Sequence, residues 1–384
     1  MTLALTAVGV TAEELRVAGD ESERAGLAAF YDVPKDLAPR PPGSIVRSEE
    51  LTGTPMASRA WRVLYWSTDM RGDPIVVSGI VVAPLGVPPP GGRIVVSWGH
   101  PTTGAARSCA PSLGLDPFLS IEGLRLLLDR GYVVAYTDYA GMGAPGSSSY
   151  LIGGTEGHNV LDAVRAAQAI PAAGAGGDVV LWGHSQGGQA VLFAAERART
   201  YAPELDVRAV AAAAPAADLG ALLDADLDDL AGVSIGSYAF TAFGKAYGGT
   251  MPGASLRGIL SPAALSRVDR MSQLCLFSQS EELHALAAPL VGDFVIRNPV
   301  TTPPWSALLR ENSAGSVGFD APLFIAQGMK DTLVHPGDTE AFVAHERSLG
   351  VEVTFEAIPI ADHGTVAYLS LPALAEFLNA TVGP

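Results

Sequence analysis

The sequence predicts an α/β fold: a mostly parallel sheet with helices on both faces and a helical cap inserted late in the chain. Apolar, β-rich runs alternate with helix-like segments from about residue 93 to residue 214, a pattern typical of parallel sheets. The alternation stops, then resumes near residue 322. The 384 residues are 48% hydrophobic and only 17% charged, so the chain has enough apolar residues for a large core and is not disordered.

Residues 1–45 are expected to lie at the periphery. A helix is predicted over residues 12–27, and the proline-rich stretch DVPKDLAPRPPGS that follows cannot form a regular helix or a central strand, so it should wrap over the domain. The first residues lack a basic segment and become acidic early, so we do not interpret them as a signal peptide. Either an intracellular protein or an exported one whose leader is absent from this chain fits that observation.

A hairpin and two strand–helix units are predicted next. Two β-rich runs, Ala60–Ser67 and Pro74–Val82, flank the turn-forming residues 69–73. The units that follow are a strand over Arg93–Trp98, a helix over Phe118–Arg130, a strand over Tyr132–Thr137 and a helix over Gly157–Ala169.

The stretch Gly183-His184-Ser185-Gln186-Gly187 has the G-x-S-x-G pattern. An apolar run, Val179–Trp182, precedes it, and a segment of helical composition, Gln189–Ala195, follows it. In this strand–turn–helix context the pattern predicts a nucleophile elbow, as in α/β-hydrolases. Glycines flank the serine where a Cβ would clash in a sharp turn. The alternative is a glycine-rich corner that contains a serine by coincidence.

The rest of the chain divides into a cap and a second part of the sheet. Val207–Ala214 is a further strand, and strands resume at Pro322–Gln327 and Glu352–Ile358. Between them lie helical stretches, Leu219–Leu230 and Ser237–Ala246, and proline-rich loops. Because the strand pattern resumes, we interpret residues 218–310 as a cap inserted between two parts of one core, 1–217 and 311–384, rather than as the start of a separate C-terminal domain.

A serine nucleophile needs a base, and α/β-hydrolases carry Ser, acid and His in that order along the chain. His363 follows the last strand and precedes a glycine, so it is the predicted base. His345 falls on a helix and His335 adjoins a helix start, where local structural roles explain them. His184 neighbours the nucleophile, but the elbow turns its side chain away, so we expect it to pack.

The acid should follow the preceding strand, where Asp331 stands. Asp338 competes, but it lies in the first turn of a predicted helix, where the helix dipole explains an aspartate. Asp362 adjoins His363, and neighbours on an extended loop usually point apart.

The oxyanion hole is predicted from the backbone amides of Gln186 and Thr103, the latter in the loop after the strand Arg93–Trp98. His100 is expected to hold that loop through hydrogen bonds of its ring. The glycines of residues 138–146 lack the spacing of a phosphate-binding loop, so we expect a loop beside the active site. No His, Cys, Asp or Glu cluster has metal-ligand spacing, and no metal or cofactor is expected.

The formal net charge of −16 argues against a nucleic-acid partner. No apolar run approaches the ~18 residues that a transmembrane helix needs. The oligomeric state is not evident from the sequence.

Several segments together resemble the lipase-A-type secretory lipase family. They are RVLYWSTDMRGDPIVVSGIVVAP, SWGHPTTGAARSCAPS, GYVVAYTDYAGMGAPGSSSYLIGGTEGHNVLDAVRA, WGHSQGG, QGMKDTLVHPGDTE and ADHGTVAY. The resemblance runs from about residue 30 to the end and implies an α/β-hydrolase with an inserted cap, a triad on Ser185, Asp331 and His363, and cleavage of carboxylic esters.

The resemblance also implies that the two cysteines, Cys109 and Cys275, form a disulfide between core and cap, and it favours secretion. Two free, buried thiols are the alternative for the cysteines.

The expected function is therefore that of a serine esterase or lipase that forms an acyl-enzyme on a small-molecule or lipid ester. An acyltransferase or lactone-forming enzyme would use the same triad, and a non-catalytic binding protein on this scaffold is a more distant alternative. Of the large cap residues, we expect some, among them Phe240, Phe243 and Trp305, to line an acyl pocket. The alternative is that these rings only form the core of the cap.

Overall fold

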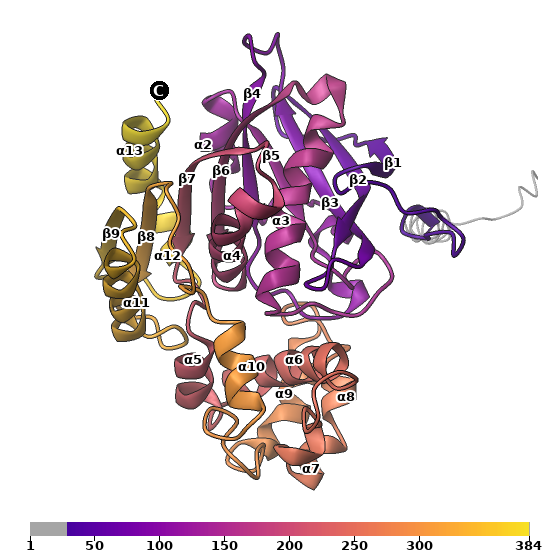
Figure 1. Ribbon diagram of the computed structural model, residues 1–384, viewed down its shortest axis with the longest axis vertical. Helices are drawn as coiled ribbons and strands as arrows, with labels where there is room; N and C mark the ends of the chain where they lie inside the picture. The colour runs from indigo at the N-terminus through magenta and orange to yellow at the C-terminus, as the bar shows by residue number, and fades with distance from the viewer. Residues whose placement is uncertain (1–28, 384) are drawn as a thin grey trace, which may run out of the picture.

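The computed structural model describes residues 29–383, which form one nine-stranded sheet in the order β1-β2-β3-β5-β4-β6-β7-β8-β9 (Figure 1). The strands are β1 (Ile45–Glu50), β2 (Ser58–Thr68), β3 (Pro74–Pro84), β4 (Arg93–Gly99), β5 (Val133–Thr137), β6 (Ala175–His184), β7 (Asp206–Ala213), β8 (Leu323–Gly328) and β9 (Val353–Ile358). Strands β4 to β9 pair in parallel, whereas β1, β2 and β3 pair antiparallel and β3 joins β5 antiparallel. The predicted α/β fold with a mostly parallel sheet is confirmed.

Helices cover both faces of this sheet. Alternate residues of the central strands belong to two different apolar clusters: Val95 and Val133 pack with α3 and α4, whereas Val96 and Val134 pack with α2 and α13. The helices of the core are α2 (Leu124–Asp129), α3 (Gly153–Gln168), α4 (Gln186–Tyr201), α11 (Pro336–Ser348), α12 (Val366–Leu369) and α13 (Leu371–Thr381). Burial on both faces explains why the central strands read as continuous apolar runs.

The segment between β7 and β8 is helical and gathers at one end of the sheet (Figure 1). Its helices are α5 (Leu219–Asp226), α6 (Leu230–Tyr247), α7 (Pro262–Leu265), α8 (Val268–Met271), α9 (Ser280–Ala287) and α10 (Trp305–Glu311). Their buried side chains are continuous with the apolar cluster on the α2 and α13 face of the sheet. We call residues 218–310 the cap.

Several local predictions differ from the structure. The helix predicted over Leu219–Leu230 ends at Asp226, and the helix predicted over Ser237–Ala246 begins already at Leu230. The helix expected over Phe118–Arg130 begins only at Leu124, because Gly123 takes a left-handed conformation, with φ of +82°, and turns the chain there. Strand β1 was not predicted, since its sequence IVRSEE is half-exposed and charged, as edge strands often are. The helix predicted over residues 12–27 lies outside the described residues.

Candidate active site

The turn from β6 into α4 holds Ser185 in a strained backbone conformation. Ser185 has φ of 56° and ψ of −117°, outside the regions that non-glycine residues normally adopt. Its amide donates to Ala213 O at 3.0 Å, which ties the turn to β7. The turn passes so close to β4 that a Cβ on Gly187 would lie 1.9 Å from Gly99 O, and one on Gly183 would lie 2.2 Å from Gly187 O. Only glycine fits at these two positions of the motif.

The structure brings Ser185, His363 and Asp331 into one line of hydrogen bonds. Ser185 Oγ lies 2.9 Å from His363 Nε2, and His363 Nδ1 lies 2.7 Å from Asp331 Oδ2. Each residue follows a different parallel strand, β6, β9 or β8, so the sheet itself sets their spacing. The side chain of Asp331 is buried, and its Oδ1 accepts the amides of Leu333 and Val334 at 2.9 Å each. This carboxylate is therefore held rigidly against the imidazole.

The alternative histidines and acids lie elsewhere. His335 stands at the N-terminal end of α11, His345 is exposed on that helix, and Asp338 lies in its first turn. Asp362 is exposed and its side chain binds Thr365.

The backbone amides of Gln186, the residue after Ser185, and of Thr103 have no hydrogen-bond acceptor among residues 29–383. The other polar groups of Thr103 are hydrogen-bonded and hold the loop in place. Thr103 Oγ1 donates to Cys109 O at 2.9 Å, and Thr103 O accepts from the amide of Leu276 at 2.9 Å. These free amides are the two that the sequence proposed for an oxyanion hole.

His100 is buried at the start of this loop. Burial lowers the pKa of His100 to about 4, so the ring is neutral at pH 7. Its Nδ1 lies 2.7 Å from Pro101 O, and the ring lies against Tyr139 with 4.4 Å between centroids. Tyr139 in turn donates to His100 O at 3.1 Å. The ring therefore stiffens the loop, as the sequence suggested.

Two buried glutamates that sequence reasoning missed lie behind the elbow. Glu122 Oε1 accepts from His184 Nδ1 at 2.7 Å, and the ring of His184 lies 5.0 Å from that of His363 between centroids. Glu156 Oε1 accepts from Gln186 Nε2 at 2.8 Å and from the amide of Leu151. Burial raises the pKa of Glu156 well above its usual range, against the opposing effect of its hydrogen bonds from Gln186 and Leu151.

The cap contacts the loop of Thr103 directly. Cys109 and Cys275 form a disulfide with 5.2 Å between their Cα atoms. Gly104, with φ of +138°, is required beside it, since a Cβ there would lie 2.7 Å from Cys109 Sγ. Tyr238 of α6 packs edge-on against Tyr150, whose hydroxyl lies 2.8 Å from Thr102 Oγ1.

The three cap aromatics singled out from the sequence are fully buried. Phe240 packs edge-on against Trp305 with 5.5 Å between ring centroids, and Phe243 packs against Tyr247 at 5.8 Å. These contacts fit the alternative in which the rings form the core of the cap, and a role in substrate binding stays a prediction.

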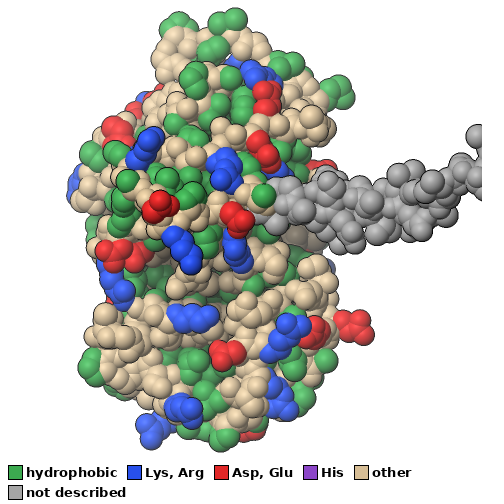
Figure 2. All heavy atoms as spheres, turned by 90° about the vertical axis from the view of Figure 1, so that its right-hand side faces the viewer, with side chains coloured by type: hydrophobic (Ala, Val, Ile, Leu, Met, Phe, Trp, Pro, Cys, Tyr) green, Lys and Arg blue, Asp and Glu red, His purple; other side chains and the backbone are tan. Residues whose placement is uncertain are grey.

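Over residues 29–383, no group of three or more His, Cys, Asp or Glu is placed to hold a metal, and no helix in that range is long and apolar enough to cross a membrane. The face shown in Figure 2 carries Lys and Arg interspersed with Asp and Glu rather than a single-sign field.

The fold is similar to that of known lipases. The structure of Candida antarctica lipase A aligns over 92% of this chain and 85% of that chain, with a TM-score of 0.73 at 22% identity. A probable inactive lipase of Mycobacterium tuberculosis is 26% identical over 91% of this chain and 80% of its own length. Lipase 5 of Candida albicans is 32% identical, but over only 46% of this chain and 41% of the yeast protein.

A family model described as secretory lipase matches residues 119–381, well over half of the chain. That match includes Ser185, Asp331 and His363, and it supports carboxylic ester hydrolysis. The protein therefore belongs to the secretory lipase family.

Proposed function

We propose that the protein hydrolyses carboxylic esters through an acyl-enzyme on Ser185. The observation that carries this proposal is the unbroken line of hydrogen bonds from Ser185 Oγ through His363 to Asp331, set on a strained elbow. A non-catalytic protein would have no need of this arrangement. It favours activity here, whereas a relative that matches over 91% of this chain is named a probable inactive lipase.

The geometry supports the following course of the proposed reaction. His363 Nε2 accepts the proton of Ser185 Oγ as the oxygen attacks the ester carbonyl, and Asp331 holds the proton on Nδ1 and stabilises the imidazolium. The free amides of Gln186 and Thr103 stabilise the oxyanion, each by about 3 kcal/mol of barrier. His363 then protonates the leaving alcohol, and afterwards it deprotonates the water that releases the acid.

The proposed substrates are esters of small alcohols or acylglycerols, the class that family membership supports. We further propose that the protein works in an oxidising compartment outside the cytosol. The disulfide between Cys109 and Cys275 supports this location, because such bonds rarely persist in reducing cytosol.

Labelling with a fluorophosphonate tests the proposal, because this probe reacts with serines that a neighbouring base activates. One adduct per chain is expected, located on the peptide of Ser185, with none on Ser185→Ala or His363→Ala. A folded wild-type protein that stays unlabelled would favour the binding-protein alternative.

A further inference from the structure

A cavity that residues of both the cap and the core line lies apart from Ser185. Its volume is about 260 Å³, and Arg71, Arg197, Tyr247, Thr250 and Glu311 are among the residues that line it. Arg71 comes from the turn between β2 and β3, Arg197 from α4, and Tyr247 from the end of α6. None of Ser185, Asp331 and His363 lines this cavity.

The two arginines bring positive charge to this cavity, which also holds one carboxylate, that of Glu311. Within the described part of the chain, neither Arg71 nor Arg197 forms an ion pair with a carboxylate. Nε of Arg197 is fully buried and has no hydrogen-bond acceptor, which is costly for a charged group. This arrangement is unexpected in a chain with a net charge of −16, where carboxylates are plentiful.

The N-terminal end of α3 adds to the same positive field. The guanidinium of Arg197 lies against Gly154 in the first turn of this helix, with Nη2 at 3.2 Å from where a Cβ of Gly154 would be. The amides of Gly153, Thr155 and Glu156 have acceptors, whereas that of Gly154 has none among residues 29–383. A helix N-terminus and a guanidinium repel each other unless an anion lies between them.

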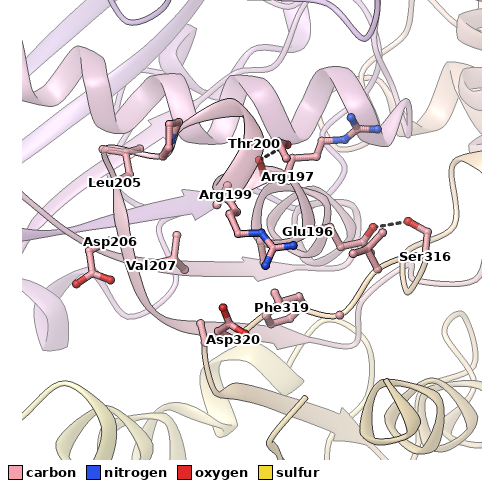
Figure 3. A pocket seen from close by; sticks show the side chains of 16 residues that line it. Glu196, Arg197, Arg199, Thr200, Leu205, Asp206, Val207, Ser316, Phe319 and Asp320 are labelled. Atoms are coloured by element: carbon pink, nitrogen blue, oxygen red, sulfur yellow. Dashed lines mark hydrogen bonds between the residues drawn. The ribbon is translucent and has the colours of Figure 1, made fainter. Parts of the chain in front are cut away.

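Arg197 also lines a larger cavity of about 560 Å³, together with Arg199 of the same helix, but the two side chains take different directions. Figure 3 shows Arg199 extending into that larger cavity beside Phe319 and Asp320, whereas the guanidinium of Arg197 turns away from it. The two arginines stand two residues apart on one helix, so Arg199 provides a matched control for Arg197.

We infer that the cavity between Arg71, Arg197 and the N-terminus of α3 binds a small tetrahedral oxyanion, either free phosphate or the phosphate group of a monoester. Such an anion would accept hydrogen bonds from both guanidinium groups and from the amide of Gly154. Arg71 already donates to Ala246 O and to Thr250 Oγ1 of the cap. An anion bound here therefore joins the cap to the core.

The charge of Glu311 predicts in which direction a substitution there changes the affinity for the oxyanion. Glu311 is the only carboxylate among the residues that line the cavity, and it accepts from Tyr247 Oη at 3.4 Å rather than from either arginine. Its charge opposes an incoming anion. Glu311→Gln should therefore bind the oxyanion several-fold more tightly than the wild-type chain.

Isothermal titration of the full-length protein with inorganic phosphate, at constant ionic strength, tests the site. One saturable site per chain is expected, with binding at least ~10-fold weaker in Arg197→Gln and weaker in Arg71→Gln. Arg71→Gln serves as the main variant if Arg197→Gln does not fold. Arg199→Gln should bind phosphate like the wild-type protein.

Glycerol 3-phosphate and acetate identify the ligand class. Tighter binding of glycerol 3-phosphate than of phosphate assigns the site to a monoester, and the reverse order assigns it to the free ion. The inference is overturned if phosphate shows no saturable binding, if acetate binds equally well, or if Arg199→Gln weakens binding as much as Arg197→Gln. Tighter binding by Glu311→Gln supports it, and weaker binding contradicts it.

Discussion

Ser185 keeps a left-handed backbone conformation that costs of order 1–3 kcal/mol for a non-glycine residue. The surrounding contacts hold it there: its amide bonds β7, and its carbonyl accepts from Gln189 and from Ala216. The strain points the hydroxyl at His363, where the proposed chemistry needs it.

Glu122 contacts His184, and His184 contacts the proposed base His363, so we regard Glu122 as a residue that positions His363. The pair is fully buried, and the His184 ring contacts the ring of His363. Glu122→Ala leaves the buried Nδ1–H of His184 without an acceptor and frees the ring to move. We expect kcat to fall by roughly 10–100-fold with little change in KM, because small displacements of a base are costly.

The conservative variant separates positioning from folding. Glu122→Gln keeps an acceptor oxygen for His184 and should retain most of the activity. Glu346→Gln, at a buried glutamate on α11, should leave kcat unchanged. An equal loss in Glu122→Gln and Glu122→Ala, or full kcat in Glu122→Ala, would refute this role.

Sequence reasoning selected Ser185, Asp331 and His363, whose side chains the structure brings together, because each follows its own strand and strand ends are evident from apolar runs. Sequence reasoning missed Glu122 and Glu156 because a glutamate near the start of a helix is usually exposed to solvent. Only tertiary contacts, with His184 and with Gln186, show that these carboxyls are buried.

The cap is joined to the loop of Thr103 directly by the hydrogen bond from Leu276 N to Thr103 O and, just after the loop, by the disulfide at Cys109. A further contact is indirect, because Tyr238 of the cap packs on Tyr150, whose hydroxyl lies 2.8 Å from Thr102 Oγ1. The loop that is proposed to stabilise the oxyanion is thus held by the cap. Movement of the cap would have to hinge away from this edge.

Removing the disulfide tests how much this link between cap and core contributes to stability. The double variant Cys109→Ser, Cys275→Ser opens a loop with a sequence separation of 166 residues. In the chain-entropy model this lowers the free energy of unfolding by about 4–5 kcal/mol. The measurement is urea unfolding beside that of Ser108→Ala, a neighbouring control. Two titratable thiols in the unreduced, denatured wild-type protein would show that the bond is absent in solution.

Substitutions of the cap aromatics test whether these rings line an acyl pocket or only form the core of the cap. If Phe240 or Trp305 lines an acyl pocket, Phe240→Leu or Trp305→Phe should shift the preference among p-nitrophenyl esters toward longer acyl chains. If both rings serve only the core of the cap, the melting temperature falls while the chain-length profile stays that of the wild-type protein.

The strand-and-helix pattern predicted the sheet and the helical segment between β7 and β8, because buried parallel strands and helices carry strong periodic signals. The pattern did not predict β1, which is held at the edge by pairing with β2 rather than by its own apolar residues. The late start of α2 depends on Gly123 packing close to Leu371, a contact between distant parts of the chain.

For the whole molecule, Glu346 makes stability depend on pH. Burial, followed by the nearby carboxylate of Glu196, raises the pKa of Glu346 to about 7, against the opposing effect of His345. Because the folded state holds this proton more tightly than the unfolded chain, its contribution is full in acid and is lost as the pH rises toward 7.

Glu346→Gln should therefore stabilise the protein at pH 8 by about 1–2 kcal/mol relative to wild type. At pH 4 the two proteins should melt at nearly the same temperature. Calorimetric melting curves at both pH values measure the difference. An equal effect of the substitution at pH 4 and pH 8 would mean that the carboxyl does not titrate in this range.

The most direct measurement is the rate of p-nitrophenyl butyrate hydrolysis by Ser185→Ala, His363→Ala, Asp331→Asn and the control Asp338→Asn, each shown to be folded. We predict that kcat falls by roughly 10⁴-fold or more for the first two, somewhat less for Asp331→Asn, and not at all for Asp338→Asn. Wild-type activity in Ser185→Ala, or a loss in Asp338→Asn with none in Asp331→Asn, would contradict the proposed triad.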